Sequence, residues 1–456
     1  MQKKEKREAD WSSLYKKEDW WALWIGLLLF FLSLPAYSKL YLLGWIPAGR
    51  NWFDVSRALG FGAVGPANAD AWWGLIGVWV FLLIVLLPVG KLIGIKPMNW
   101  IAGFTVIFWI SMLLWVFAFY SPLVKVMGSS EVGFVFALIA GMILGNLPKL
   151  PQPLRDSARG EFFIKTAIVL LGAKILFTTL VTVILPVLEA VFLAFPVVWV
   201  LAYLLSRRLG MDEKFSATLS SGVGVCGIAA AIATAGAIDA PPIYATMVSS
   251  IIVVFAALEL LVLPWLGATF FPHHLNAAGV WMALSVKTDG AAAASGAVVS
   301  GLLGQGPSGI PAVMAVTTKV LMDVWIGLIA LILATVFSYF VEKKPGAKVD
   351  PMILWYRFPK FVLGYFFTSL VLSAIAFTYP TVAAGAAAVA PVSNFGTTPL
   401  QVIFFSLTFT SIGINTRFSA LRQVGLRRPS TAYLLALLFA IAWGGILTYL
   451  FFGGLP

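Results

Sequence analysis

The sequence predicts an all-α protein that crosses a lipid bilayer many times. Hydrophobic residues make up 60% of the 456-residue chain and charged residues only 11%, whereas about a quarter of the residues in a soluble domain are charged. Apolar runs long enough to cross a hydrocarbon core of about 30 Å recur along the whole chain. A β-barrel would instead show segments of about 10 residues with alternating polarity, a pattern that the sequence lacks.

About thirteen apolar runs are candidate transmembrane helices. They lie near residues 20–37, 71–89, 100–120, 133–147, 161–181, 184–206, 214–238, 242–267, 276–300, 311–341, 357–379, 397–418 and 430–452. Before them, residues 1–19 form a charged cytosolic arm. The first three spans, within 20–125, contain few polar residues and are expected to be a peripheral extension that faces lipid.

The remaining ten spans divide into two sets of five, 133–267 and 276–452. A chain that crosses the membrane five times ends on the opposite side, so the second set of five is inverted relative to the first. Inverted repeats are a common transporter design. We therefore expect a ten-helix core of two inverted five-helix repeats.

The basic residues indicate how the chain is oriented. If the N-terminus is cytoplasmic, 23 of the 31 Lys and Arg residues lie in or beside inside loops, and the C-terminus lies outside. Four lie in outside loops: Lys39, Arg50, Arg57 and Lys125. The net charge of +12 therefore reflects topology, and no nucleic-acid partner is expected. Four further lysines fall within predicted spans: Lys165, Lys174, Lys287 and Lys319.

The stretch SSGVGVCGIAA carries three glycines at the spacing of a dinucleotide-binding fingerprint, Gly222, Gly224 and Gly227. A small-residue apolar segment follows it in place of an amphipathic helix, so we do not expect a nucleotide site. The glycines instead predict a break in a membrane helix, and a helix starting near Gly227 would direct its N-terminus at an anion. Hydroxyl and thiol groups beside the break are candidate ligands: Ser220, Ser221 and Cys226. The alternative is a small-residue face for helix packing.

Two other stretches place ionisable residues inside predicted spans, which makes them candidate functional sites. SVKTDG contains Lys287 and Asp289, and TTKVLMD contains Lys319 and Asp323 at i and i+4 on one helical face. The simpler interpretation is that each lysine pairs with its neighbouring aspartate, with Lys287 reaching toward the cytosolic surface.

A second break is predicted in TSIGINTRF, where Gly413 precedes Asn415 and Thr416. This stretch lies in the fourth span of the second set, as Gly222–Gly227 lies in the fourth span of the first. We therefore expect the two breaks to face each other across a binding site. A competing similarity between LLGAKILFTTL and SIGINTRFSAL leaves the register of the repeat open.

Other site chemistries have little support in the sequence. Cys226 is the only cysteine, His273 and His274 are expected in a short cytosolic loop, and no metal site is predicted. The motifs of nucleotide-driven pumps and of membrane hydrolases are missing, so we expect neither an enzyme nor a bound cofactor. Glu189 and Glu259 are expected to be structural partners within the spans.

Four stretches resemble one known family of bacterial membrane proteins, the YeiH-like sulfate exporter family (UPF0324). They are ALIAGMILGN, SSGVGVCGIAAAIATA, FPKFVLGYFF and SIGINTRFSALRQVGLRRP, in the family's order and spacing over about 133–452. The resemblance implies export of sulfate or a related anion. It also implies the fold of cation/proton antiporters and bile-acid symporters, with inverted five-helix repeats and crossing broken helices. Lys287-Thr288-Asp289 stands where many relatives have His before an acidic residue, and Met322 where relatives have Arg.

The sequence thus predicts a secondary active transporter in the bacterial inner membrane that moves sulfate, another sulfur oxyanion or a sulfonate by alternating access. Glycines and hydroxyls at the break, Cys226, Lys287, Lys319, Asn415 and Thr416 would bind the anion. Asp289 and Asp323 would couple transport to H⁺ or Na⁺. Expected partners are the anion and the lipid bilayer, and a homodimer is compatible with the sequence. The alternatives are a Na⁺/H⁺-type antiporter and a non-transporting scaffold or sensor.

Overall fold

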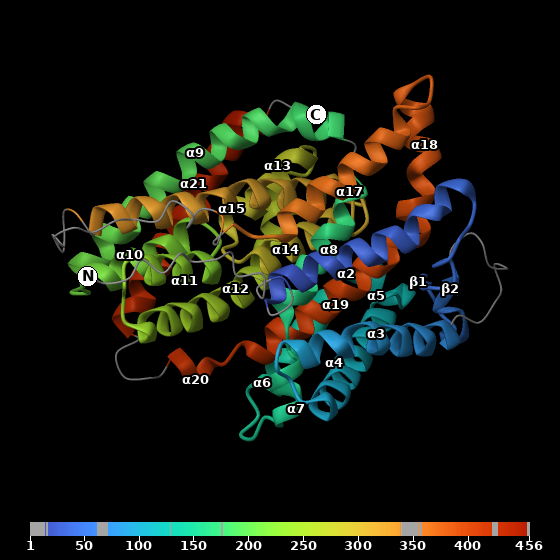
Figure 1. Ribbon diagram of the computed structural model, residues 1–456, viewed down its shortest axis with the longest axis horizontal. Helices are drawn as coiled ribbons and strands as arrows, with labels where there is room; N and C mark the ends of the chain where they lie inside the picture. Colours follow the sequence, from blue (N-terminus) through green and yellow to red (C-terminus); the bar gives the residue numbers. More distant parts are fainter. Residues whose placement is uncertain are drawn as a thin grey trace, which may run out of the picture.

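The computed structural model describes residues 17–61, 72–127, 129–174, 177–337, 358–421 and 427–453, together with Leu14, Tyr339 and Trp355. The described part of the chain is mainly helical (Figure 1). One small antiparallel sheet pairs β1 (Pro47–Gly49) with β2 (Leu59–Phe61). A short 3-10 turn, η1 (Leu34–Ser38), precedes the sheet, and another, η2 (Val55–Arg57), lies between its strands. The predicted arm at 1–19 lies mostly outside the described residues, as does most of the predicted loop at 342–356.

Eight segments of the described chain are long and apolar enough to cross a membrane. They comprise α2 (Glu18–Ser33) with η1, α3 (Trp72–Leu92), α4 (Pro97–Ala118), α9 (Phe177–Arg208), α12 (Pro242–Phe270), α15 (Ile310–Val336), α18 (Val382–Val392) through α19 (Thr398–Asn415), and α21 (Arg427–Phe452). The π-helical turn η4 (Ser393–Thr397) joins α18 to α19. A bent pair, α5 (Ser121–Met127) and α6 (Val132–Gly145), would make a ninth span, with 94° between its halves. The prediction of an all-α polytopic membrane protein is confirmed.

The remaining predicted spans are built from shorter helices. Residues 161–181 hold α8 (Gly160–Gly172) and the start of α9, and 357–379 hold α17 (Phe361–Ala376). Two predicted spans are each divided in two, 214–238 into α10 (Glu213–Gly224) and α11 (Ile228–Ala237), and 276–300 into α13 (Leu275–Ser285) and α14 (Asp289–Leu302). Short helices α7 (Gln152–Ser157) and α20 (Phe418–Leu421) complete the chain. The count of thirteen spans and the inverted repeats therefore remain unconfirmed.

Contacts between loops define one end of the helical bundle. Asn99 donates to Asp156 at 2.7 Å, and Asn146 donates to the carbonyl of Thr416 at 2.8 Å. Arg417 lines a cavity with the first turns of α12, and the Gly210 turn packs beside Arg428. The loops that these contacts join carry most of the described Lys and Arg residues, so we call this end of the bundle the basic end.

The N-terminal extension is joined closely to the other helices. Helix α2 packs on α8 and α17, while α4 packs on α6, α7 and α19. At Gly103, an added Cβ would lie 2.0 Å from the carbonyl oxygen of Pro153, so this contact requires glycine. The opposite faces of these helices carry exposed apolar side chains such as Trp24 and Phe31. The extension therefore has one face against the bundle and exposed apolar side chains on the other, while its predicted contact with lipid stays a prediction.

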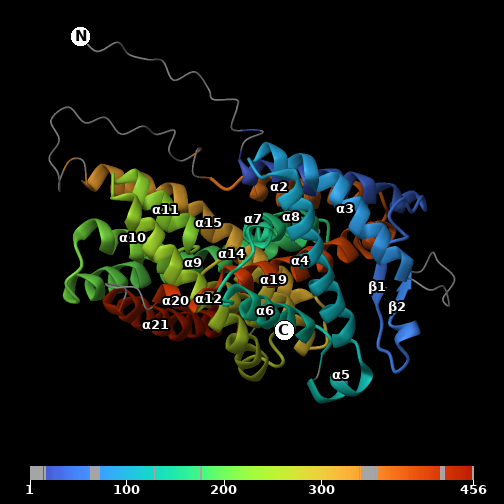
Figure 2. The same ribbon diagram turned by 90° about the horizontal axis from the view of Figure 1, so that it is seen from below.

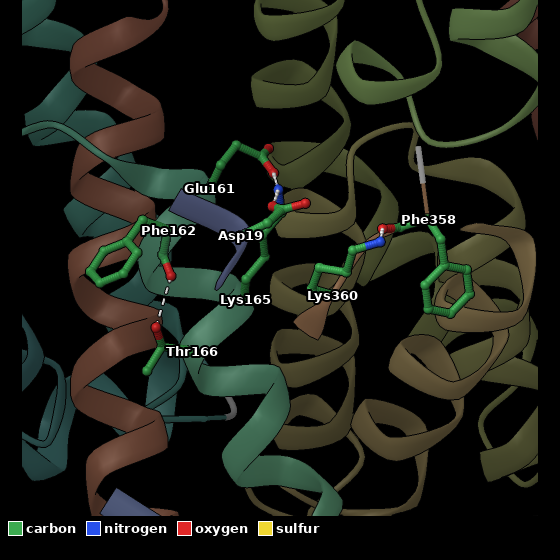
Figure 3. A network of polar contacts seen from close by, with 7 residues as sticks. All are labelled: Asp19, Glu161, Phe162, Lys165, Thr166, Phe358 and Lys360. Atoms are coloured by element: carbon green, nitrogen blue, oxygen red, sulfur yellow. Dashed lines mark hydrogen bonds and ion pairs between the residues drawn. The ribbon is translucent and has the colours of Figure 1, made fainter. Parts of the chain in front are cut away.

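Ion pairs fasten α2 to α8 near the basic end. Lys165 Nζ lies 2.6 Å from Asp19 Oδ1 and 3.8 Å from Glu161 Oε2 (Figure 3). Arg159 makes a 2.9 Å ion pair with Glu18. Lys360 at the start of α17 donates to the carbonyl oxygen of Phe358 at 2.9 Å, close to this network (Figure 3). Lys165, one of the four lysines predicted within spans, is thus neutralised locally by acidic residues.

Candidate functional site

Helices α10 and α11 form a re-entrant hairpin, residues 213–237, which we call the first hairpin. The two helices lie side by side in both views (Figures 1 and 2). Lys214 Nζ, at the start of α10, donates to the carbonyl oxygen of Asp239, just after α11, at 3.0 Å. The Tyr244 hydroxyl, at the start of α12, donates to Asp212 at 2.7 Å. The first hairpin therefore enters from the basic end and returns to it, so the predicted span at 214–238 does not cross the bundle.

The tip of the first hairpin is the segment Val225–Gly227 between the two helices. Gly227 has φ of +73°, and an added Cβ there would lie 2.8 Å from the carbonyl oxygen of Lys287. Both the left-handed backbone and the close contact favour glycine. The predicted break in the glycine-rich stretch is confirmed, although the chain turns back at the break where a crossing helix was expected.

Helices α13 and α14 form the second hairpin, residues 275–302. Gly279 on α13 and Gly296 on α14 both pack against Pro311 at the start of α15, so the two helices run back along each other. Asn276 at the base of this hairpin lines the same cavity as Ser308. The 29-residue helix α12, about 43 Å long, connects the base of the first hairpin to the base of the second. The two hairpins therefore enter from opposite ends of the bundle. His273 and His274, at the base of the second hairpin, lie away from the basic end, so they do not share an end with the other loops predicted to be cytosolic.

The two tips meet beside the middle of α12. Ile252 of α12 packs against Gly227, and Glu259 of α12 accepts a hydrogen bond from the backbone N–H of Lys287 at 3.0 Å. The tip of the second hairpin is Val286–Thr288, and the Thr288 hydroxyl caps α14 by accepting from Ala291 N at 3.1 Å. Helices α11 and α14 both begin at this meeting point, so two helix N-termini with partial positive charge converge there.

Lys319 of α15 links the two tips. Its Nζ donates to the carbonyl oxygen of Val225 in the first tip at 3.1 Å and of Val286 in the second tip at 2.9 Å. A third bond reaches the carbonyl oxygen of Ala283 at 3.4 Å. These bonds use all three donors of the ammonium group. Among the described residues Lys319 makes no ion pair with Asp323, so the predicted i, i+4 pair does not form.

Three acidic or sulfur-bearing side chains lie next to Lys319. Cys226 Sγ and carboxylate oxygens of Asp289 and Asp323 lie within 4.8 Å of one another. The exposed fractions of these residues are only 2%, 3% and 1%. One oxygen of Asp289 and both oxygens of Asp323 have no hydrogen-bond partner in the described part of the chain. Burying bare carboxylates is costly, so this cluster needs a proton or a cation.

Lys287 lies on the other side of the second tip. Its Nζ donates to the carbonyl oxygen of Leu284, and its backbone N–H is held by Glu259. No ion pair joins Lys287 to Asp289 among the described residues, so the simpler interpretation of that pair is also wrong. Glu259 is a structural partner of the tip, as expected.

The remaining residues predicted in the first hairpin belong to α10, which packs against α9 and α12. Ser220 donates to the carbonyl oxygen of Ser216 at 2.7 Å, and Ser221 accepts from the Trp199 indole N–H at 3.0 Å. Gly222 and Gly224 belong to the last turn of α10 and pack against Ile252 and Phe195. Both serines are buried and have protein partners, one turn below the tip.

The predicted second break at Gly413–Thr416 is wrong, because α19 runs without interruption from Thr398 to Asn415. An added Cβ at Gly413 would lie 2.3 Å from the carbonyl oxygen of Leu138, so this glycine allows α19 to pack closely on α6. Asn415 donates to the carbonyl oxygen of Ala158 at 2.8 Å, and Thr416 donates to the carbonyl oxygen of Ile412 at 2.7 Å. The segment that faces the first tip is Val286–Thr288.

Each end of the bundle has a cavity. At the basic end, a cavity of about 410 Å³ is lined by Ile228, the first residue of α11, together with Asn415 and Arg417. At the opposite end, a cavity of about 730 Å³ is lined by Lys174 and Ser308 and reaches Met314 of α15. The charged residues at the tips are buried and line neither cavity.

Comparison with known proteins gives the family of the chain. A family model described as conserved hypothetical protein 698 matches residues 103–432. A UPF0324 membrane protein of Nitrosomonas europaea is 33% identical over 97% of this chain and 96% of its own. The chain therefore belongs to the UPF0324 membrane protein family. UPF0324 membrane proteins of Rhodopirellula baltica and Nitratidesulfovibrio vulgaris are 29% and 30% identical over 85% and 75% of this chain. These alignments cover 69% and 58% of the two relatives.

No solved structure matches this UPF0324 protein. Its relatives are named as membrane proteins, and its eight long apolar helices agree with that description. It is a multi-pass membrane protein.

Proposed function

We propose that this UPF0324 protein is a secondary active transporter of a small anion. One observation carries the proposal: two re-entrant hairpins enter from opposite ends and meet at a buried, charged centre. Short helices whose N-termini converge inside a membrane protein are a recurring way to bind an anionic substrate group. A protein that only anchors or scaffolds others has no need to bury two lysines and three acidic residues in one place.

In this proposal the anion binds between the hairpin tips. Backbone N–H groups at the starts of α11 and α14 face it, and Gly227 lets the first tip approach closely. Lys287 and Lys319 supply positive charge from the second hairpin and from α15. Ser220, Ser221 and Cys226 belong to the wall of the first hairpin. Asn415 lines the basic-end cavity and Thr416 follows it in the chain, so their role would be on the route of the anion to the tips.

The coupling ion would bind at Asp289 and Asp323. Their unpartnered oxygens lie in the same buried cluster, and Asp323 is one turn from Lys319 on α15. A proton or Na⁺ bound there would neutralise the excess negative charge. Release of this ion would weaken the contact between the two tips. Alternating access then consists of opening the site first to one cavity and afterwards to the other.

The family resemblance points to sulfate, another sulfur oxyanion or a sulfonate as the anion, since helix N-termini and lysines suit any small oxyanion. We also propose that the protein lies in the bacterial inner membrane with its basic end in the cytoplasm. The proposed transport needs no enzymatic step and no organic cofactor.

A Na⁺/H⁺-type antiporter is the second candidate function. The observation that favours it is the pair of buried carboxylates, Asp289 and Asp323, without hydrogen-bond partners for three of their four oxygens among the described residues. In that case the cation itself would be the substrate and the helix N-termini would only stabilise the fold.

Flux measurements in proteoliposomes distinguish these functions. We expect the full-length protein to move labelled sulfate, thiosulfate, sulfite or taurine when a pH or Na⁺ gradient is imposed. Lys319→Ala should reduce this flux at least tenfold, whereas Lys149→Ala, at an exposed position of the basic end, should not. Cation-dependent proton movement without anion flux would assign the antiporter function. Absence of any flux in well-folded protein would reject transport and favour a scaffold or sensor.

A further inference from the structure

Cys226, Asp289 and Asp323 come from three different elements and converge on one buried point. Cys226 is in the first tip, Asp289 begins α14, and Asp323 lies on α15. We infer that these three groups form a binding site for a thiophilic divalent cation such as Zn²⁺. This inference does not depend on the proposed anion transport, but a bound Zn²⁺ would take the place of the H⁺ or Na⁺ proposed at Asp289 and Asp323.

The geometry suits a metal ion held by three protein ligands. The three ligand atoms lie within 4.8 Å of one another, whereas tetrahedral zinc with bonds of about 2.0–2.3 Å brings its ligands to about 3.5 Å apart. Small side-chain rotations close this difference. Three protein ligands leave the fourth tetrahedral position for water.

The unpartnered carboxylate oxygens are a second and separate indication of a ligand. Both oxygens of Asp323 and one of Asp289 accept no hydrogen bond from described residues outside the cluster itself, although both side chains are buried. Buried polar atoms in native proteins almost always have partners. Lys319 makes no ion pair with them among the described residues and directs its three donors to backbone carbonyl oxygens of the hairpins.

The charges balance when a divalent ion is bound. A thiolate and two carboxylates carry three negative charges, while Zn²⁺ and the adjacent Lys319 ammonium carry three positive charges. Hard ions such as Mg²⁺ prefer oxygen ligands only, so a thiol in the set selects zinc-like ions. The ligands lose their protons to solvent when the metal binds. A bound ion would tie the first tip to α14 and α15 and hold the two hairpins together.

Cadmium tests this site directly, because a cadmium–thiolate bond absorbs in the near ultraviolet. Cys226 is the only cysteine, so any such band in the purified full-length protein reports this residue. We expect one band that saturates at one Cd²⁺ per chain, is removed by competing Zn²⁺, and is insensitive to Mg²⁺. Zn²⁺ should also raise the melting temperature of the wild type and not that of Cys226→Ser.

The carboxylate ligands are tested with Asp289→Asn and Asp323→Asn. Each should weaken Cd²⁺ binding at least tenfold, while the matched change Asp156→Asn at the basic end should leave it unchanged. A band of unchanged affinity in both variants would overturn the site, since it would report the thiol alone. Failure of the wild type to give a band would overturn it without any variant, as would stabilisation by Na⁺ or Mg²⁺ alone. Neither result depends on whether the protein moves anions.

Discussion

The two hairpins have similar shapes but contribute different chemistry to the site. The first tip, Val225–Gly227, has no charged side chain and approaches its partner through the bare backbone of Gly227. The second tip and the residue after it place Lys287, Thr288 and Asp289 at the same point. One hairpin thus supplies close approach and the other supplies charge, and Lys319 bonds to carbonyl oxygens of both. Variants that affect one hairpin or the link between them separate these contributions.

The largest effect is expected for Lys319→Met, which removes the link between the tips. The change eliminates three hydrogen bonds and leaves Asp289 and Asp323 without a nearby cation. Removing one partner from a buried charged group destabilises a protein by about 3–5 kcal/mol. The melting temperature of the purified protein should therefore fall markedly and flux should be lost. Lys149→Met is the control, and equal melting temperatures for the two variants would contradict the role of Lys319.

Gly227→Ala should have the next largest effect, because the backbone of the first tip contacts the second tip at this glycine. The new methyl group meets the carbonyl oxygen of Lys287 at 2.8 Å, and the residue has φ of +73°. Strain of this kind costs about 1–3 kcal/mol. The matched control is Gly94→Ala, where φ is +91° and no atom lies within 4 Å of the added methyl group. If Gly227→Ala loses more stability and more flux than Gly94→Ala, the difference reports the contact between the tips. Equal losses in the two variants would show that this contact is not important.

Glu259→Gln tests how the second hairpin is held by α12. The glutamate accepts the backbone N–H of Lys287 at 3.0 Å, and hydrogen bonds to charged groups contribute about 1.5–3 kcal/mol. Glutamine keeps an acceptor oxygen, so we expect a loss of about 1 kcal/mol in unfolding free energy. Chemical denaturation of the two proteins in the same detergent measures it. Unaltered stability would mean that Glu259 does not hold the tip.

The break in the first hairpin was predictable from the sequence because its cause is local. Three glycines in six residues disrupt a helix wherever they lie, and charged residues in apolar runs are conspicuous. The return of the chain at the break was also signalled, although more weakly. The pieces on either side, α10 and α11, have only 12 and 10 residues, about 15–18 Å each, so neither crosses a bilayer alone.

The partners in the site depend on packing that one sequence does not reveal. Gly413 suggests a helix break in the sequence, but in the structure its small size allows α19 to pack closely on α6. Lys319 and Asp323 have the spacing of an ion pair, yet the ammonium group is drawn to carbonyl oxygens left free at the ends of α10 and α13. Open carbonyl groups at helix ends compete with a carboxylate for a nearby lysine. This competition is decided by which helix ends α15 passes, and that is a property of the whole fold.

The smallest effect is expected for Thr288→Ala, which removes the side-chain cap of α14 in the second hairpin. The Thr288 hydroxyl accepts the N–H of Ala291 at 3.1 Å, and loss of such a cap costs about 1 kcal/mol. Thr288→Ser keeps the hydroxyl and should retain wild-type stability. The first hairpin has no side-chain cap at the equivalent position, since Gly227 precedes α11. The wild-type protein already has an uncapped helix start in the first hairpin. If Thr288→Ala also retains flux, the site needs the backbone N–H groups at the start of α14 and does not need the Thr288 hydroxyl. Loss of flux in Thr288→Ala with restoration in Thr288→Ser would instead make the hydroxyl itself part of the binding site.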